Sequence, residues 1–109
     1  MLRVMQEKEK LSPLPKSDQW FLYILKCKGG SLYTGVTKDL NRRFKMHKAG
    51  KASRYTRTRR PVKLLYQEMC GSRTQALVRE CAVKAFPRKK KLSLIKTFSF
   101  KIQDAIHSV

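Results

Sequence analysis

Glu80 is the residue in this chain with the clearest capacity for chemistry. It is one of seven acidic residues set against 26 lysines and arginines, and the formal net charge is +19 at pH 7. The spacing of its apolar neighbours places Glu80 on the apolar face of an amphipathic helix. A carboxylate in such a position needs a paired cation or a metal ion. Two interpretations follow: an ion pair with Lys84, four residues later, or a magnesium site.

The basic surface around this carboxylate indicates a polyanionic partner. A pI near 10.5 favours nucleic acid or, less specifically, an anionic membrane surface. A protein that only neutralises phosphates would carry the same charge, so a binding protein is the alternative to an enzyme. No apolar run approaches transmembrane length, and no signal-peptide core is visible at the N-terminus. The sequence therefore predicts a cytoplasmic protein that does not act at a membrane.

The three cysteines do not indicate a metal centre. Cys27, Cys70 and Cys81 are odd in number and show no C-x-x-C spacing. Neither a zinc site nor a disulfide framework is expected from such a pattern. They are expected to be small hydrophobic residues in a reducing compartment.

Hydrophobic periodicity divides the chain into six elements behind an N-terminal extension. Residues 1–19 mix charges with two prolines and lack periodicity, which predicts a flexible extension. Residues 20–97 are expected to form one domain, and residues 98–109 a tail whose secondary structure the sequence leaves open. The predicted elements are strands at 20–25, 31–36 and 62–69 and helices at 37–49, 72–86 and 88–96. Their order, β-β-α-β-α-α, predicts an α/β (α+β) fold with a small three-stranded antiparallel sheet flanked by helices.

The length of the first hairpin loop decides which side chains share a face of the sheet. A two-residue loop would put Tyr23 and Tyr33 on opposite faces, whereas a three-residue loop puts both on one face with Gly35. Consecutive glycines at positions 29 and 30 favour the three-residue loop, which needs a residue in the left-handed conformation. At Gly35 the missing side chain is expected to let a phosphate or a helix approach the sheet.

The first predicted helix carries two polar residues on its apolar face. Leu40, Arg43, Phe44 and His47 fall at i, i+3, i+4 and i+7, which is one side of a helix. Arg43 and His47 are therefore expected on, or at the rim of, the side turned toward the sheet. A guanidinium there could form two parallel hydrogen bonds to a phosphate, and an imidazole could transfer a proton.

Only two other acids lie between residues 20 and 97. Asp39 is expected to cap the first helix, as Thr37 could also do, and Glu68 is expected at a solvent-facing strand end. The sequence thus offers no second carboxylate for a two-metal site. A single-metal mechanism fits this composition, since magnesium keeps most of its waters and takes few carboxylates.

The order and spacing of six residues resemble the GIY-YIG endonuclease superfamily, and most closely its small stand-alone bacterial subgroup. These residues are Tyr23, Tyr33, Gly35, Arg43, His47 and Glu80. The resemblance covers residues 20 to about 97. Leu22-Tyr23-Ile24 stands for the first motif and Tyr33-Thr34-Gly35 for the second, and the spacing continues through residues 37–47 and 76–84. Leu22 replaces the first-motif glycine and Thr34 the second-motif isoleucine, which puts substrate geometry in doubt more than activity.

The resemblance implies a metal-dependent endonuclease that hydrolyses phosphodiester bonds in DNA. It implies one Mg²⁺ or Mn²⁺ ion with Glu80 as its protein ligand, and no small-molecule cofactor. Tyr33 or His47 would accept the proton of the attacking water, Arg43 would stabilise charge on the phosphate, and Tyr23 would orient the phosphate or the water. A tyrosine is a poor base at neutral pH unless a cation such as Arg43 lowers its pKa. An RNA substrate, the biological role and the oligomeric state stay open.

The loop at residues 51–60 is expected to contact the nucleic-acid backbone, because it is rich in cations and shows no base-reading pattern. Solvated charge is the alternative for this loop, and Tyr55 within it could stack on a base or cover the core. The predicted substrate-binding residues are Gly35, Arg42, Arg54, Arg57, Arg59, Arg60 and Lys84. The alternative function is a non-catalytic nucleic-acid-binding module on the same fold, which would need none of the six site residues.

Overall fold

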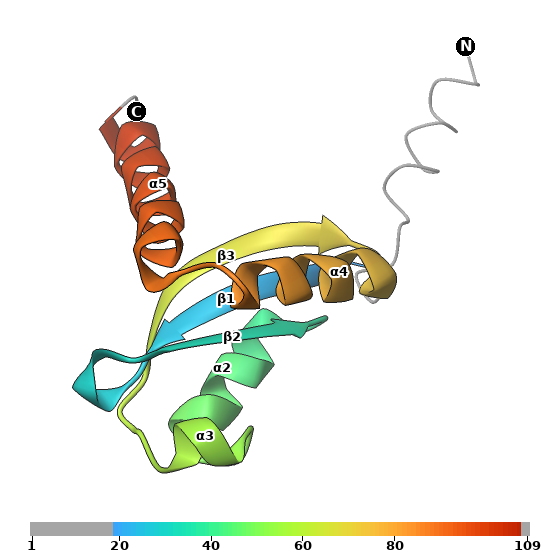
Figure 1. The fold of residues 1–109 in the computed structure, drawn as a ribbon, viewed down its shortest axis with the longest axis vertical. Coiled ribbons are helices and arrows are strands. Elements are labelled where there is room, and N and C mark those ends of the chain that lie inside the picture. Colours follow the sequence, from blue (N-terminus) through green and yellow to red (C-terminus); the bar gives the residue numbers. More distant parts are fainter. Residues whose placement is uncertain (1–18, 108–109) are drawn as a thin grey trace.

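The computed structural model describes the backbone of residues 19–107 and the side chains of residues 19–98 (Figure 1). Most of the predicted extension, residues 1–18, lies outside the described part. The elements in chain order are β1 (Trp20–Lys26), η2 (Lys28–Gly30), β2 (Leu32–Thr37), α2 (Leu40–Lys48), α3 (Arg54–Arg57), β3 (Lys63–Gly71), α4 (Arg73–Lys84) and α5 (Arg88–His107). The predicted order of strands and main helices is confirmed, and so is the α+β class.

The strands form one antiparallel sheet in the order β2-β1-β3. The hairpin between β1 and β2 has the three-residue loop expected from its two glycines, whose φ angles are 87° and 91°. The N–H of Cys27 donates to the carbonyl of Ser31 at 2.8 Å and closes this loop. Tyr23 is consequently paired with Gly35, and Tyr33 lies two residues before Gly35 on the same face.

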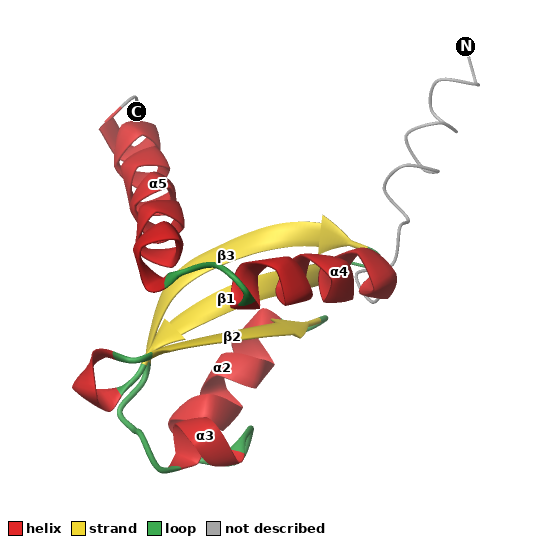
Figure 2. Ribbon diagram, viewed as in Figure 1, coloured by secondary structure: helices red, strands yellow, loops and turns green. Residues whose placement is uncertain are grey.

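The central strand β1 separates two small cores. In the view of Figure 2, α2 lies below the sheet and α5 rises above it. Leu22 and Ile24 are fully buried on one face, where they pack with Val83 of α4 and with side chains of α5. Tyr23 and Leu25 are fully buried on the other face, against side chains of α2. Burial on both faces explains why β1 is a continuous apolar run rather than an alternating one.

Caps fix the ends of the two helices that carry site residues. The Asp39 carboxylate accepts from the N–H of Arg42 at 3.1 Å, so Asp39 is the cap and α2 begins after it. Gly50, with a φ of 79°, follows the last residues of α2. Ser72 and Gln75 form the predicted capping box at the start of α4.

Two helices differ from the prediction. The expected loop at 51–60 contains the one-turn helix α3, which Ser53 caps by accepting from the N–H of Thr56 at 3.1 Å. Helix α5, expected to end near Lys96, continues to His107 because neither proline nor glycine interrupts its sequence. The C-terminal tail, whose secondary structure the sequence left open, is therefore helical up to His107. Among the described residues, no helix has the length and apolar character needed to cross a membrane.

The prediction for Glu68 was wrong. It is half-buried, and its carboxylate pairs with Arg79 of α4 at 2.7 Å and accepts from the hydroxyl of Tyr66. Burial raises the pKa of Glu68, but hydrogen bonds from Arg79 and Tyr66 lower it more, so its pKa lies below the ordinary value. The carboxylate thus joins β3 to α4 and is committed to the fold, which leaves Glu80 as the acid whose charge acts on Tyr23.

Candidate active site

A hydrogen bond between Tyr23 and His47 forms the buried centre of the candidate site. Tyr23 stands in the middle of β1, and His47 lies in the last turn of α2. Helix α2 packs through Leu40 and Phe44 on the face of the sheet that carries Tyr23. The hydroxyl oxygen of Tyr23 lies 2.8 Å from Nε2 of His47. Each residue is only 1% exposed. The predicted inward orientation of His47 is confirmed, and its partner is Tyr23 rather than Tyr33.

The second nitrogen of His47 also has a buried partner. Its Nδ1 lies 2.8 Å from Oγ1 of Thr56, which belongs to α3 and is fully buried. Oγ1 of Thr56 is in turn 2.9 Å from the hydroxyl of Ser53. The sequence-based interpretation missed Thr56, and the signal that could have found it is the Ser53-Arg54-Tyr55-Thr56 spacing of a capped helical turn. At four residues, such a turn is hard to distinguish from a loop.

Burial sets the protonation states of the central pair. It raises the pKa of Tyr23 well above the ordinary value, the charge of Tyr33 raises it further, and Arg43 lowers it less than these two raise it. Tyr23 is therefore a neutral phenol at pH 7, and the cation does not make it a phenolate. Burial and then the charge of Arg43 lower the pKa of His47 to about 4. His47 is consequently a neutral imidazole with one nitrogen free to accept a proton.

Tyr33 covers this pair and continues outward as an aromatic column. Its ring centroid lies 5.1 Å from that of His47 in an edge-on arrangement and 6.4 Å from that of Tyr23. Tyr55 of α3 stacks on Tyr33 at 5.8 Å, and the guanidinium of Arg59 lies 3.9 Å over the Tyr55 ring. Tyr55 therefore covers the candidate site rather than the core, with 37% of its surface exposed.

Gly35 makes room for the phenol of Tyr23. A Cβ atom at this position would lie 2.5 Å from the Tyr23 hydroxyl oxygen and 2.7 Å from the adjacent ring carbon. The space that the sequence-based interpretation assigned to an approaching phosphate or helix is thus filled by Tyr23. Glycine is required here because a side chain would collide with Tyr23. The backbone at Gly35 has the conformation of an ordinary strand, so it does not itself require glycine.

We expect Gly35→Ala to displace the Tyr23 ring and break its hydrogen bond to His47. Overpacking of this kind costs about 1–3 kcal/mol of unfolding free energy. Urea unfolding of Gly35→Ala beside the wild type would measure the cost. In a Tyr23→Leu background the same substitution should cost much less, since no phenol remains to be displaced. An equal cost in both backgrounds would contradict the contact.

Arg43 and Glu80 approach the Tyr23 hydroxyl from different helices. Arg43 of α2 is half-buried and acts on both Tyr23 and His47 through its charge. Glu80 of α4 is close enough that its negative charge contributes to the raised pKa of Tyr23. Four of the predicted catalytic residues, Tyr23, Tyr33, Arg43 and His47, thus meet on the α2 side of the sheet, and Glu80 joins them from α4.

Glu80 forms the ion pair that its helical spacing predicted. Its side chain is 18% exposed, and its carboxylate lies 3.0 Å from Nζ of Lys84, whose side chain is 56% exposed. Within the described residues no cluster of three His, Cys, Asp or Glu side chains occurs, so a metal site here would depend on this carboxylate and on water. One mostly buried carboxylate with an exposed, displaceable cation fits magnesium, which keeps several of its waters.

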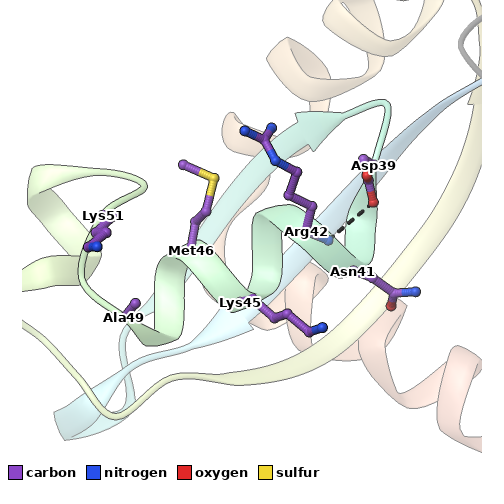
Figure 3. Close-up of a pocket in the computed structure, with 7 residues that line it drawn as sticks. All are labelled: Asp39, Asn41, Arg42, Lys45, Met46, Ala49 and Lys51. Carbon is purple, nitrogen blue, oxygen red and sulfur yellow. Dashed lines mark hydrogen bonds between the residues drawn. The ribbon is translucent and has the colours of Figure 1, made fainter.

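The predicted substrate-binding cations are distributed over three places. The arginines at 54, 57, 59 and 60 gather on and just after α3 and are exposed, and Lys84 lies on α4 beside Glu80. Arg42 lies instead on the outer side of α2, in a shallow hollow of about 430 Å³ shared with Lys45 and Lys51 (Figure 3). The residues that line this hollow are Asp39, Asn41, Arg42, Lys45, Met46, Ala49 and Lys51.

Comparisons with known proteins identify the family of this chain. The GIY-YIG family, described as the GIY-YIG catalytic domain, matches residues 19–93. UPF0213 proteins from Staphylococcus aureus strains Mu3 and N315 are each 52% identical over 79 residues, which is 72% of this chain and 96% of each relative.

A solved structure shows a similar match in sequence. The solution NMR structure of a UPF0213 protein from Bacillus halodurans is 42% identical, with a TM-score of 0.49, over 72% of this chain and 84% of that one. The match over residues 19–93 and the identity to the staphylococcal relatives confirm the resemblance seen in the six site residues. The chain belongs to the GIY-YIG catalytic domain family.

Proposed function

We propose that this protein is a metal-dependent endonuclease that hydrolyses phosphodiester bonds in DNA. The GIY-YIG catalytic domain is a nuclease domain, which makes nucleic acid the substrate class. The observation that carries the proposal is the 2.8 Å hydrogen bond between Tyr23 and neutral His47, beside the guanidinium of Arg43. A protein that only bound nucleic acid would have no use for a buried proton acceptor at the edge of a cationic surface.

The Tyr23–His47 pair supports a proton relay. A water molecule attacks the phosphorus and passes a proton to the Tyr23 oxygen, while the phenolic proton of Tyr23 passes to Nε2 of His47. The new bond joins the water oxygen to phosphorus, and the bond from phosphorus to the leaving sugar oxygen breaks, with that oxygen taking a proton from solvent water. No phenolate forms along this path, which suits the raised pKa of Tyr23. The sequence-based interpretation gave proton acceptance to Tyr33 or His47, whereas in this scheme the ring of Tyr33 packs against Tyr23 and His47.

Arg43 has two effects in this scheme. Its guanidinium can bind the phosphate and stabilise the added negative charge of the transition state. Burial is the main cause of the low pKa of His47 and the charge of Arg43 is the second, so a phosphate bound to Arg43 would offset the second cause alone and raise this pKa in part. The free protein therefore keeps His47 neutral, and substrate binding prepares it to accept a proton.

Glu80 would hold the metal ion, together with water molecules. A magnesium ion there would supply Lewis-acid stabilisation of charge on the phosphate oxygens. Lys84, now paired with Glu80 at 3.0 Å, is exposed enough to turn toward a DNA phosphate instead. The exposed arginines around α3 would bind the flanking backbone without reading bases, because their neighbours offer no hydrogen-bonding pattern for bases.

Incubating the purified protein with duplex, nicked, branched and single-stranded DNA, and with RNA of matched sequence, would test the proposal. We expect cleavage of at least one DNA substrate with Mg²⁺ or Mn²⁺ and none in excess chelator. DNA binding should weaken steeply between low and high salt, because phosphate contacts release counterions. Salt-sensitive binding without cleavage of any substrate would favour the binding module, and cleavage in chelator would exclude the metal role.

A further inference from the structure

Thr56 carries a buried hydroxyl group that the proposed reaction does not use. It is 0% exposed and lies in a helix of only four residues, where propensity alone would not hold it in place. Ser53 caps that helix and accepts from the Thr56 N–H at 3.1 Å, which points Oγ1 of Thr56 into the protein. There it lies 2.8 Å from Nδ1 of His47, the nitrogen that faces away from Tyr23.

The neighbours of the imidazole decide which nitrogen carries its proton. A neutral imidazole has one N–H donor and one acceptor nitrogen. On the Nε2 side, the hydroxyl of Tyr23 lies 2.8 Å from Nε2, and burial keeps this phenol protonated, so the hydroxyl is the donor and Nε2 the acceptor. On the Nδ1 side, the Thr56 hydroxyl has another acceptor for its proton, the carbonyl of Ser53 at 3.4 Å. Both sides favour a proton on Nδ1.

We propose that Thr56 is a positioning residue that accepts from Nδ1–H of His47 and so keeps Nε2 free to receive the Tyr23 proton. Without this acceptor the imidazole could carry its proton on Nε2 and donate to Tyr23, which would reverse the hydrogen bond on which the relay depends. Thr56 touches neither substrate nor metal in this scheme, and acts only through His47. The inference rests on the proposed function for its effect on rate, but its effect on the tautomer stands independently.

The isosteric change Thr56→Val tests the role in catalysis. It removes the acceptor and keeps the shape, so kcat should fall about 10- to 100-fold, as is typical when the partner orienting a functional histidine is lost. The KM for DNA should change little, because Thr56 lies beneath the surface that binds the phosphates. Thr56→Ser restores the hydroxyl and should recover most of kcat. Thr58→Val, the same change at an exposed position that follows α3, is the matched control.

Nitrogen-15 NMR of the resting protein tests the tautomer without any substrate. The chain has two histidines, His47 and His107, so a His107→Gln variant assigns the signals. In the wild type and in Thr58→Val we expect protonated Nδ1 and unprotonated Nε2 at His47. In Thr56→Val we expect Nε2 to carry the proton in a large share of molecules. If Thr56→Val does not fold, Thr56→Ala removes the same acceptor with less crowding.

Two results would overturn the role of Thr56. The first is a wild-type protein with the proton on Nε2 of His47. The second is Thr56→Val with unchanged kcat and unchanged nitrogen shifts. A wild-type protein that cleaves no DNA would instead contradict the proposed function. The NMR comparison would still decide whether Thr56 sets the tautomer of His47.

Discussion

Glu80→Gln should abolish DNA cleavage and leave DNA binding almost intact. The substitution keeps the shape of the side chain but removes the only carboxylate in the described part of the chain whose charge acts on the pKa of Tyr23. Losing several kcal/mol of charge stabilisation corresponds to a fall in rate on the order of a thousandfold or more. Binding should tighten slightly, since one negative charge is removed from a cationic surface. Single-turnover cleavage and fluorescence anisotropy would measure the two effects.

The ion pair with Lys84 supplies the control for this prediction. Lys84→Met breaks the same 3.0 Å pair but keeps the carboxylate. If Glu80 served only to pair with Lys84, the two variants would lose activity to the same extent. If the carboxylate takes part in the reaction, Lys84→Met should affect mainly DNA affinity, while Glu80→Gln affects kcat. Glu68→Gln, which removes a carboxylate committed to Arg79, should lower stability and leave the metal requirement of cleavage unchanged.

Tyr23→Phe should lower kcat about 100- to 1,000-fold, because the proton relay loses the atom that joins the attacking water to His47. The ring and its packing against Gly35 are retained, so the fold should survive. Stability should still fall by about 1–3 kcal/mol, since Nε2 of His47 is left buried without a partner. Cleavage rates with saturating DNA, together with urea unfolding, would check both numbers.

The comparison with Tyr33→Phe decides which of the two tyrosines accepts the proton of the attacking water. This substitution removes the same atom from the neighbouring ring, which meets the ring of His47 in an edge-to-face arrangement. The relay predicts a smaller loss of kcat for Tyr33→Phe than for Tyr23→Phe. The opposite order would return the role of base to Tyr33 and leave Tyr23 as an orienting group, as the sequence-based interpretation had it.

The sequence predicted the parts of the site that depend on periodicity. Two glycines indicated the loop that puts Tyr23 and Tyr33 on one face, and the four-residue spacing of Arg43 and His47 indicated the inward face of α2. Both are local rules of strand and helix geometry, so they hold without knowledge of the packing. The ion pair between Glu80 and Lys84 follows from the same rule.

The parts that the sequence could not predict depend on contacts between distant segments. The bond between Tyr23 and His47 spans 24 residues of sequence, and nothing in either segment indicates which tyrosine the imidazole meets. Glu68 resembled a solvent-facing strand end because its partner Arg79 lies on α4, whose place over β3 is set by the packing. The requirement for glycine at position 35 could not be predicted either, because it depends on the pairing of β2 with β1, which places the Tyr23 ring where a side chain of residue 35 would lie.

The one-turn helix α3 carries two kinds of side chain. Arg54 and Arg57 are exposed, whereas Thr56 is buried and contacts His47. Short surface segments open more readily than the central strand, which is hydrogen-bonded on both sides. In the absence of DNA, α3 is therefore the part whose motion most easily disturbs the imidazole. A DNA backbone bound by its arginines would restrain α3 and so hold Thr56 more firmly against His47 than in the free protein.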